Sequence, residues 1–180
     1  MTGFTRHRKS RLVIANFSGF EADLLRSLAS QLVELLRNER AVPIHAEDPL
    51  EALLDFTGPT EEPDDPEAAG DFRRFTEGTL RDGKADAAVA LIDGLEEAGL
   101  PPELTEDGLV IDVELDEATA ETWMRSFTDM RLALATRLEV EEGDEDYWAT
   151  LSEDDPRGQA HDIYLWMGYL QETLVEALTS

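Results

Sequence analysis

Apolar residues recur at helical spacing in four long stretches of the chain. In the first, Leu25, Leu28 and Leu32 follow one another at steps of three and four, which places them on one face of a helix. Ser18 and Glu21 precede this stripe and have the spacing of a capping box. The pattern therefore predicts a helix that begins just after Ser18.

The second stretch follows an acidic, turn-rich segment and predicts a long helix from about residue 66, with Gly83 as a point of interruption. Asp-Pro pairs mark the expected start of this helix at residues 65–66, of an earlier helix at 48–49, and of the last helix at 155–156. Asp at an N-cap accepts hydrogen bonds from free backbone N–H groups, and Pro at the next position loses no helical hydrogen bond.

The last two stretches predict a pair of long helices. The first runs from about Asp116 to Leu138 and is apolar on both sides, which is typical of a helix at the centre of a bundle. The second runs from Pro156 to about Leu178. The connection between them is acidic and contains Tyr147 and Trp148, which we expect to pin it to the body.

Two short stretches have the features of β-strands. Residues 11–17 are β-branched and aliphatic, and residues 109–115 alternate between apolar and polar. We expect them to pair as a small two-stranded antiparallel ribbon sheltered by helices, because an isolated pair is marginal in water. The predicted fold is mainly α: a single helical domain over residues 11–180, with about five helices and this ribbon. Residues 1–10 are predicted to be a basic, flexible tail.

The chain is strongly acidic. Its 180 residues include 41 acidic and 15 basic residues, a formal net charge of −26. Such a surface favours basic partners and repels polyanions. The chain has no cysteine, no apolar run long enough to span a membrane and no signal-peptide pattern. We therefore expect a cytoplasmic protein with no membrane partner.

Charged residues interrupt the otherwise apolar segment DMRLALATRL. Asp129, Arg131 and Arg137 project from it at different angles, so at least one guanidinium should enter helix contacts. A buried guanidinium left unpaired would cost roughly 3–5 kcal/mol. We therefore interpret these residues as structural, with Asp162 or Glu172 of the last helix as partners. A binding pocket is the alternative.

A second group of basic residues lies in the long helix predicted from residue 66. Arg74, Arg81 and Lys84 lie near one helical face, and Arg73 is displaced from it by about 100°. Ion pairs with acidic neighbours are one interpretation, and a patch that binds carboxylate or phosphate is the other. A small-anion or ligand pocket would require four cations to converge: Arg74, Arg81, Arg131 and Arg137.

Catalytic and metal-binding motifs are absent from the sequence. It contains no GxxxxGK[ST] phosphate loop, no GxGxxG after a strand, no GxSxG and no HExxH. His161 could be a general base, but a single histidine near a helix start is far more often a surface or packing residue. The acidic clusters EEGDED and SEDD lack the spacing of a calcium loop. We therefore predict no enzymatic activity, no catalytic residues, no metal and no cofactor.

Four segments match a family pattern when they are taken in order: FEADLLRSLASQLVELL, DFRRFTEGTLRDGK, AETWMRSFTDMRLALATRL and HDIYLWMGYLQETLVEAL. They resemble the blocks of an actinobacterial family known only as a domain of unknown function, number two thousand and seventeen, often encoded beside the Clp protease adaptor. The resemblance covers about residues 20–178. It implies a common fold and brings no established activity and no catalytic residues.

The function predicted from these observations is that of a non-enzymatic, acidic protein-interaction or regulatory module. Its expected partner is a protein, which the charge suggests is basic, or a second copy bound through the apolar helix faces. A DNA-binding regulator that uses the basic residues 6–11 is one alternative, although the charge disfavours nucleic acid. The four-cation ligand pocket is the other.

Overall fold

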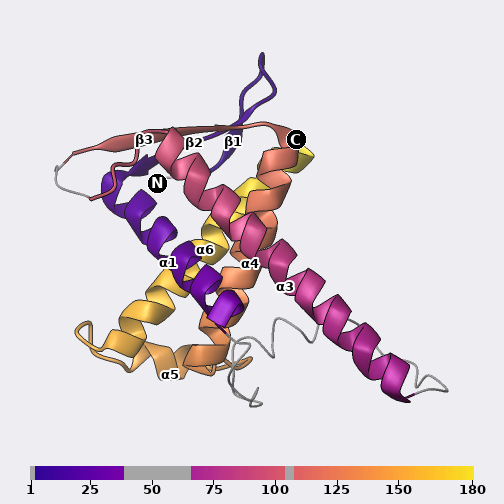
Figure 1. The fold of residues 1–180 in the computed structure, drawn as a ribbon. Coiled ribbons are helices and arrows are strands. Elements are labelled where there is room, and N and C mark those ends of the chain that lie inside the picture. Colours follow the sequence, from indigo (N-terminus) through magenta and orange to yellow (C-terminus); the bar gives the residue numbers. More distant parts are fainter. Residues whose placement is uncertain (1–2, 39–65, 104–107) are drawn as a thin grey trace.

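The computed structural model describes residues 3–38, 66–103 and 108–180 of the chain. Five helices and a three-stranded antiparallel sheet make up this part (Figure 1). The strands are β1 (Thr5–Arg6), β2 (Val13–Ser18) and β3 (Val110–Leu115). The helices are α1 (Gly19–Asn38), α3 (Pro66–Glu97), α4 (Glu117–Leu138), α5 (Glu145–Ala149) and α6 (Pro156–Thr179). The mainly helical fold is confirmed, and the helix start predicted at residues 48–49 lies outside the described residues.

Helices α1, α3, α4 and α6 begin where the sequence predicts, and short-range hydrogen bonds cap the first turns of α1, α4 and α6. At α1, the Glu21 N–H donates to the Ser18 hydroxyl at 3.1 Å and the Ser18 N–H donates to the Glu21 carboxylate at 2.9 Å, which is the predicted capping box. Asp116 accepts a backbone N–H at the start of α4 at 2.8 Å, and Asp155 does the same at α6 at 2.9 Å. Helix α3 begins at Pro66.

The core lies where α1, α4, α6 and the C-terminal half of α3 pack beneath the sheet (Figure 1). Helix α4 packs against α6 and against α3, which is the central position predicted from its two apolar sides. Helix α3 runs without interruption through Gly83. One glycine costs a helix only about 1 kcal/mol relative to alanine, and the burial of Leu91 and Leu95 outweighs that cost.

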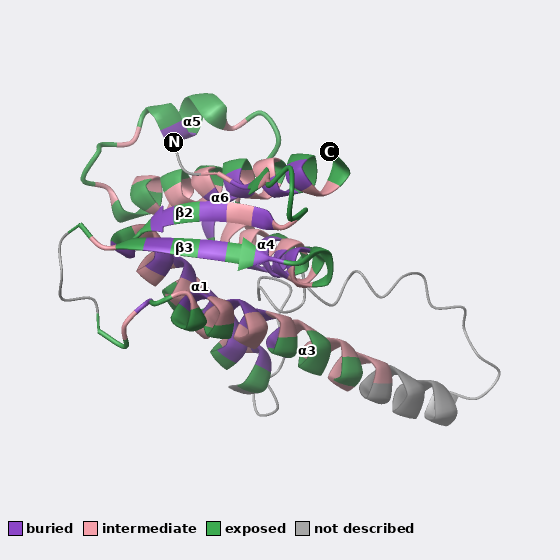
Figure 2. Cartoon of the chain, turned by 90° about the horizontal axis from the view of Figure 1, so that it is seen from above, coloured by how far each residue is buried: buried purple, intermediate pink, exposed green. Residues whose placement is uncertain are grey.

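The predicted pairing of the two longer strands is confirmed. Strands β2 and β3 are antiparallel, with Ala15 opposite Val113 and Phe17 opposite Ile111. Buried and exposed residues alternate along both strands (Figure 2), so the buried side chains of the sheet join the core and the others face solvent.

The N-terminal segment differs from the flexible tail expected over residues 1–10. Thr5 and Arg6 form β1, which adds a third strand beside β2. Phe4 is buried, and its ring lies edge-on to three core rings at centroid distances of 5.7, 6.3 and 6.0 Å: Phe17, Trp123 and Phe127. One large aromatic side chain in the core stabilises enough to offset the ordering of a few residues.

A second contact holds the same segment at the other end of the chain. The Arg6 guanidinium donates to the carbonyl oxygens of Ala177 and Leu178, at 2.7 and 3.2 Å. These carbonyls belong to the last turn of α6, where helical carbonyls lack partners within the helix. Arg6 therefore caps α6, and the basic residues that remain lie at the tip of the β1–β2 hairpin.

The acidic connection between α4 and α6 contains the short helix α5. Trp148 is buried, its indole N–H donates to Asp144 at 2.8 Å, and its ring stacks on His161 with centroids 4.3 Å apart. Tyr147 is exposed. Trp148 therefore pins the connection as predicted, and Tyr147 contributes little burial.

Candidate functional site

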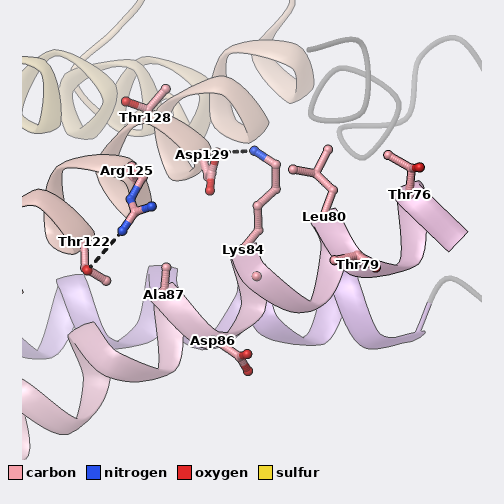
Figure 3. Close-up of a pocket in the computed structure, with 11 residues that line it drawn as sticks. Thr76, Thr79, Leu80, Lys84, Asp86, Ala87, Thr122, Arg125, Thr128 and Asp129 are labelled. Carbon is pink, nitrogen blue, oxygen red and sulfur yellow. Dashed lines mark hydrogen bonds and ion pairs between the residues drawn. The ribbon is translucent and has the colours of Figure 1, made fainter. Parts of the chain in front are cut away.

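A cavity of about 910 Å³ lies between α3 and α4 (Figure 3). We call it the α3–α4 groove. Helix α3 lines it with Thr76, Thr79, Leu80, Gly83, Lys84, Asp86 and Ala87, and α4 lines it with Thr122, Arg125, Thr128 and Asp129.

An ion pair crosses the α3–α4 groove. Lys84 Nζ lies 2.7 Å from Asp129 Oδ1, and their side chains are only 14% and 7% exposed (Figure 3). Burial raises the pKa of Asp129, although the hydrogen bond from Lys84 and the charges of Lys84 and Arg125 act in the opposite direction. Since a buried carboxylate is costly without its cation, this pair links α3 to α4.

The walls of the groove are apolar and hydroxyl-bearing. The Thr122 and Thr128 hydroxyls donate to carbonyl oxygens of their own helix, at 3.1 and 3.2 Å, so their hydrogen atoms are already used within α4. Leu80 and Ala87 add apolar surface from α3. Arg125 donates to the Thr122 hydroxyl at 3.3 Å and forms no ion pair with a described residue. The groove thus combines apolar walls with a cation that can donate hydrogen bonds to a carboxylate or carbonyl oxygen.

The other predicted ion-pair candidates behave differently from Asp129. The Arg131 guanidinium donates to the side-chain oxygen of Gln171 at 2.8 Å and lies 5.2 Å from the centre of the Tyr164 ring. Arg137 is exposed in the last turn of α4. Within the described ranges neither arginine forms an ion pair, so the expected partners, Asp162 and Glu172, are not used.

The orientation of α6 about its own axis explains this difference. Met167, Leu170 and Leu174 of α6 face the core, and this orientation turns Asp162 and Glu172 toward solvent. The α6 residues that reach Arg131 are then an amide and an aromatic ring. Delocalised guanidinium groups stack well on such rings, so Arg131 is accommodated without a carboxylate.

The cations of the predicted ligand pocket do not converge. Arg81 lines a cavity with Leu36 and Arg37, Arg131 lines one beside α6, and Arg137 lies beside α1. Lys84 lies in the α3–α4 groove, paired with Asp129. Arg73 and Arg74 are on α3, but their side chains lie outside the described residues. The three described arginines therefore lie in separate places, and a pocket built from them together is not formed.

Within the part of the chain that the structure describes, no group of three or more His, Cys, Asp or Glu side chains is placed to hold a metal ion. The described helices are also too short or too polar to cross a membrane. His161, the histidine considered as a general base, stacks on Trp148 in a packing role.

Comparison with known protein families identifies the family of this chain. The profile of the domain-of-unknown-function family DUF2017 matches residues 1–178. The chain belongs to this family. No solved structure matches the chain significantly.

The DUF2017 chain also resembles part of a named mycobacterial protein. A protein of Mycobacterium leprae (strain TN), provisionally named oxidative stress regulator AosR, is 35% identical over 107 residues, which are 59% of this chain and 43% of that protein. The chain thus matches less than half the length of this relative. The family resemblance seen in the sequence is confirmed, and the family description carries no activity.

Proposed function

We propose that the chain is a non-enzymatic regulatory module that binds part of a partner protein in the α3–α4 groove. The observation that carries the proposal is the groove itself, about 910 Å³ between two long helices with Leu80, Ala87 and threonine side chains on its walls. Amphipathic helices dock into apolar grooves through side chains at helical spacing. The expected occupant is therefore an amphipathic helix of the partner, with an acidic or carbonyl group near Arg125.

The charge of the chain defines the partner further. The net charge of −26 creates a negative field around the body, which attracts a partner that is basic outside its apolar face. The paired Lys84 and Asp129 contribute little to this field because they neutralise each other. Binding should therefore weaken as salt screens the long-range attraction, while the apolar contacts in the groove persist.

The regulatory part of the proposal draws on the Mycobacterium leprae relative, whose provisional name is that of an oxidative stress regulator. The matched region is 43% of that protein, so the role of the whole relative is carried over only as a proposal. The chain has no cysteine. A regulatory role in oxidative stress would therefore use contacts with a partner and not a cysteine thiol of this chain.

The test places a photo-crosslinking residue in the groove. We expect the crosslinker at Ala87, which lines the groove, to capture a partner that the same crosslinker at the exposed Ala118 does not capture. With the captured protein purified, Ala87→Trp should weaken binding at least about tenfold because it fills the groove, and Ala118→Trp should not. Equal capture at both positions, or full binding by the Ala87→Trp variant, would contradict the proposal.

A second candidate function rests on the β1–β2 hairpin. Arg8, Lys9 and Arg11 are exposed at its tip. Backbone hydrogen bonds between His7 and Leu12 and between Arg11 and His7, at 2.8 and 3.0 Å, hold this tip, and Arg11 adopts a left-handed conformation with φ 64°. Such an ordered basic tip on an acidic body could contact a nucleic-acid phosphate backbone.

This candidate predicts DNA binding that falls steeply with salt. The assay is fluorescence anisotropy with duplex DNA at ~50 mM salt, a condition under which even non-specific binding should be measurable. Charge reversal by Arg8→Glu with Lys9→Glu is preferable to deletion of the segment, because deletion also removes Phe4 from the core. Absence of binding by the unaltered chain would eliminate the candidate.

A further inference from the structure

The outward face of α6 carries an unusual concentration of exposed apolar residues. Leu165, Tyr169 and Val175 are 55%, 37% and 41% exposed, and they are three of the six large hydrophobic side chains exposed in the described residues. They lie on the side of α6 away from Leu170 and Leu174, which are buried. A soluble helix normally buries one apolar face and exposes a polar one, so this second apolar face needs an explanation.

A guanidinium lies within the same face. Arg131 of α4 borders a cavity of about 560 Å³ together with Leu165, Tyr169 and Val175. The guanidinium passes over Gly168, where an added Cβ would lie only 3.1 Å from Arg131 Nη2. Glycine at this position therefore lets the charge lie flat on α6, beside the apolar side chains.

The hydrogen-bonding capacity of Arg131 is only partly used. Its Nη1 donates to Gln171, its Nε is buried without a hydrogen bond, and its Nη2 donates to no described residue. Glu172 lines the same cavity, is exposed and forms no ion pair within the described ranges. The face therefore contains a cation and an anion that lie near each other without pairing.

We propose that this face of α6 is the interface of a homodimer, in which Glu172 of each copy pairs with Arg131 of the other. A two-fold interface brings the same patch of both copies together, so a patch with one unpaired cation and one unpaired anion complements itself. An antiparallel α6 pair centred at the level of Leu170 places Gly168, and the Arg131 above it, opposite Glu172 of the second copy. The same register places Leu165 opposite Val175.

The charge distribution favours a second copy over other occupants. A basic partner would satisfy Glu172 and leave Arg131 facing a like charge, and an acidic partner would do the reverse. Aromatic and arginine side chains surrounded by apolar groups are also typical of the centre of protein interfaces. The interface is separate from the α3–α4 groove, so the proposed partner binding and the homodimer can succeed or fail independently.

Salt dependence distinguishes this dimer from other associations. Two copies with a net charge of −26 each repel one another at long range, and salt screens that repulsion within about 10 Å at 0.1 M. The homodimer should therefore become tighter as salt increases. Attraction of a basic partner or of a polyanion would become weaker.

The experiment is sedimentation velocity of the full chain at ~50 µM and at ~0.05 and ~0.5 M salt, concentrations that span strong and weak screening. We expect a species of twice the 20.1 kDa chain mass, more abundant at high salt. Leu165→Glu should weaken association at least about tenfold because it places a charge within the apolar part of the interface, opposite Val175 of the second copy. Phe20→Glu, which alters an exposed apolar residue outside the face, should leave association unchanged.

Charge exchange tests the specific pairing. Glu172→Arg should give monomers, and combining it with Arg131→Glu should restore the dimer because the pair is regenerated in the opposite sense. Circular dichroism confirms that each variant is folded. A monomer at both salt concentrations would overturn the proposal, as would a dimer that tolerates Leu165→Glu. A folded charge-exchange variant that stays monomeric would overturn the Arg131–Glu172 pairing itself.

Discussion

Replacement of Lys84 by methionine tests the role of the ion pair in the α3–α4 groove. Methionine keeps an unbranched apolar side chain and removes the ammonium group from Asp129, 2.7 Å away. Loss of one partner of a buried pair costs about 3–5 kcal/mol. We expect the low end, about 3 kcal/mol, because Lys84 is 14% exposed at an open groove and the charge of Arg125 still acts on Asp129.

Urea unfolding measures this loss at neutral pH, with tryptophan fluorescence as the signal, to which the buried Trp123 contributes. For a slope of about 2 kcal/mol per molar urea, a loss of about 3 kcal/mol lowers the midpoint by about 1.5 M. The matched control is Lys9→Met at the exposed hairpin tip, which should change stability by less than about 0.5 kcal/mol.

A double-mutant cycle separates the ion pair from other effects of the substitution. Asp129→Leu alone should also destabilise the fold, because it leaves the Lys84 ammonium without its carboxylate. The double variant Lys84→Met with Asp129→Leu should recover most of the stability, since apolar residues of similar size often replace a buried ion pair without loss. The expected coupling is about 2 kcal/mol or more.

The pH dependence provides an independent check. Burial raises the pKa of Asp129 above its ordinary value of 3.8, so the folded state binds the proton more tightly than the unfolded state. Ionisation of Asp129 therefore lowers stability as pH rises from 3.8 through the folded-state pKa. Without Lys84 this pKa should rise further, and the deficit of the Lys84→Met variant should shrink toward low pH. A neutral-pH loss below about 1 kcal/mol, with no coupling in the cycle, would refute the reasoning.

Four further predictions concern the fold. Phe4→Ala should lower the free energy of unfolding by about 3–5 kcal/mol because the ring is buried, and a neutral effect in urea unfolding would restore the flexible-tail interpretation. Gly94→Ala should destabilise by about 1–3 kcal/mol because its Cβ would lie 2.8 Å from a core tryptophan ring. Gly83→Ala in the same helix meets nothing within 4 Å, so it should raise the free energy of unfolding by about 0.5–1 kcal/mol, and calorimetry should show this as a higher melting temperature. Backbone and indole N–H donors hold the pKa of Asp144 below 3.8. The ionised Asp144 carboxylate therefore stabilises the site around Trp148 above pH 3.8, and this stabilisation is lost as pH falls through the lowered pKa. Asp144→Ala should remove that acid transition from the tryptophan fluorescence.

Helix positions were predictable from the sequence because their signals are local. The Ser18–Glu21 box and the caps Asp116 and Asp155 involve residues two or three apart, and an apolar stripe repeats within one or two turns. The pairing of β2 with β3 was also predictable, since those were the two strand-like segments the sequence showed. Strand β1 was missed because two residues are too short for a pattern, and the one available signal was an isolated Phe4 in a polar segment.

The groove and its ion pair required the tertiary structure. Lys84 and Asp129 are 45 positions apart, and their meeting depends on how α3 and α4 rotate and cross. The sequence groups Asp129 with Arg131 and Arg137 as structural residues, and for Lys84 it leaves open an ion pair with acidic neighbours or a patch that binds carboxylate or phosphate. The signal that could have linked them was that Lys84 is the one lysine in the chain outside the hairpin tip, on a helix expected to pack against α4.

What the sequence determined by itself was the position of the four long helices α1, α3, α4 and α6, the antiparallel ribbon and the negative charge of the whole. These depend on neighbours within a few residues or on composition, so no knowledge of distant contacts was needed. Tertiary packing alone decided that Phe4 enters the core, that Arg131 lies on Gly168 and that Glu172 faces outward. The angle of each helix about its axis is set by the best fit of many buried side chains at once, and that angle decides which charged side chains lie close together.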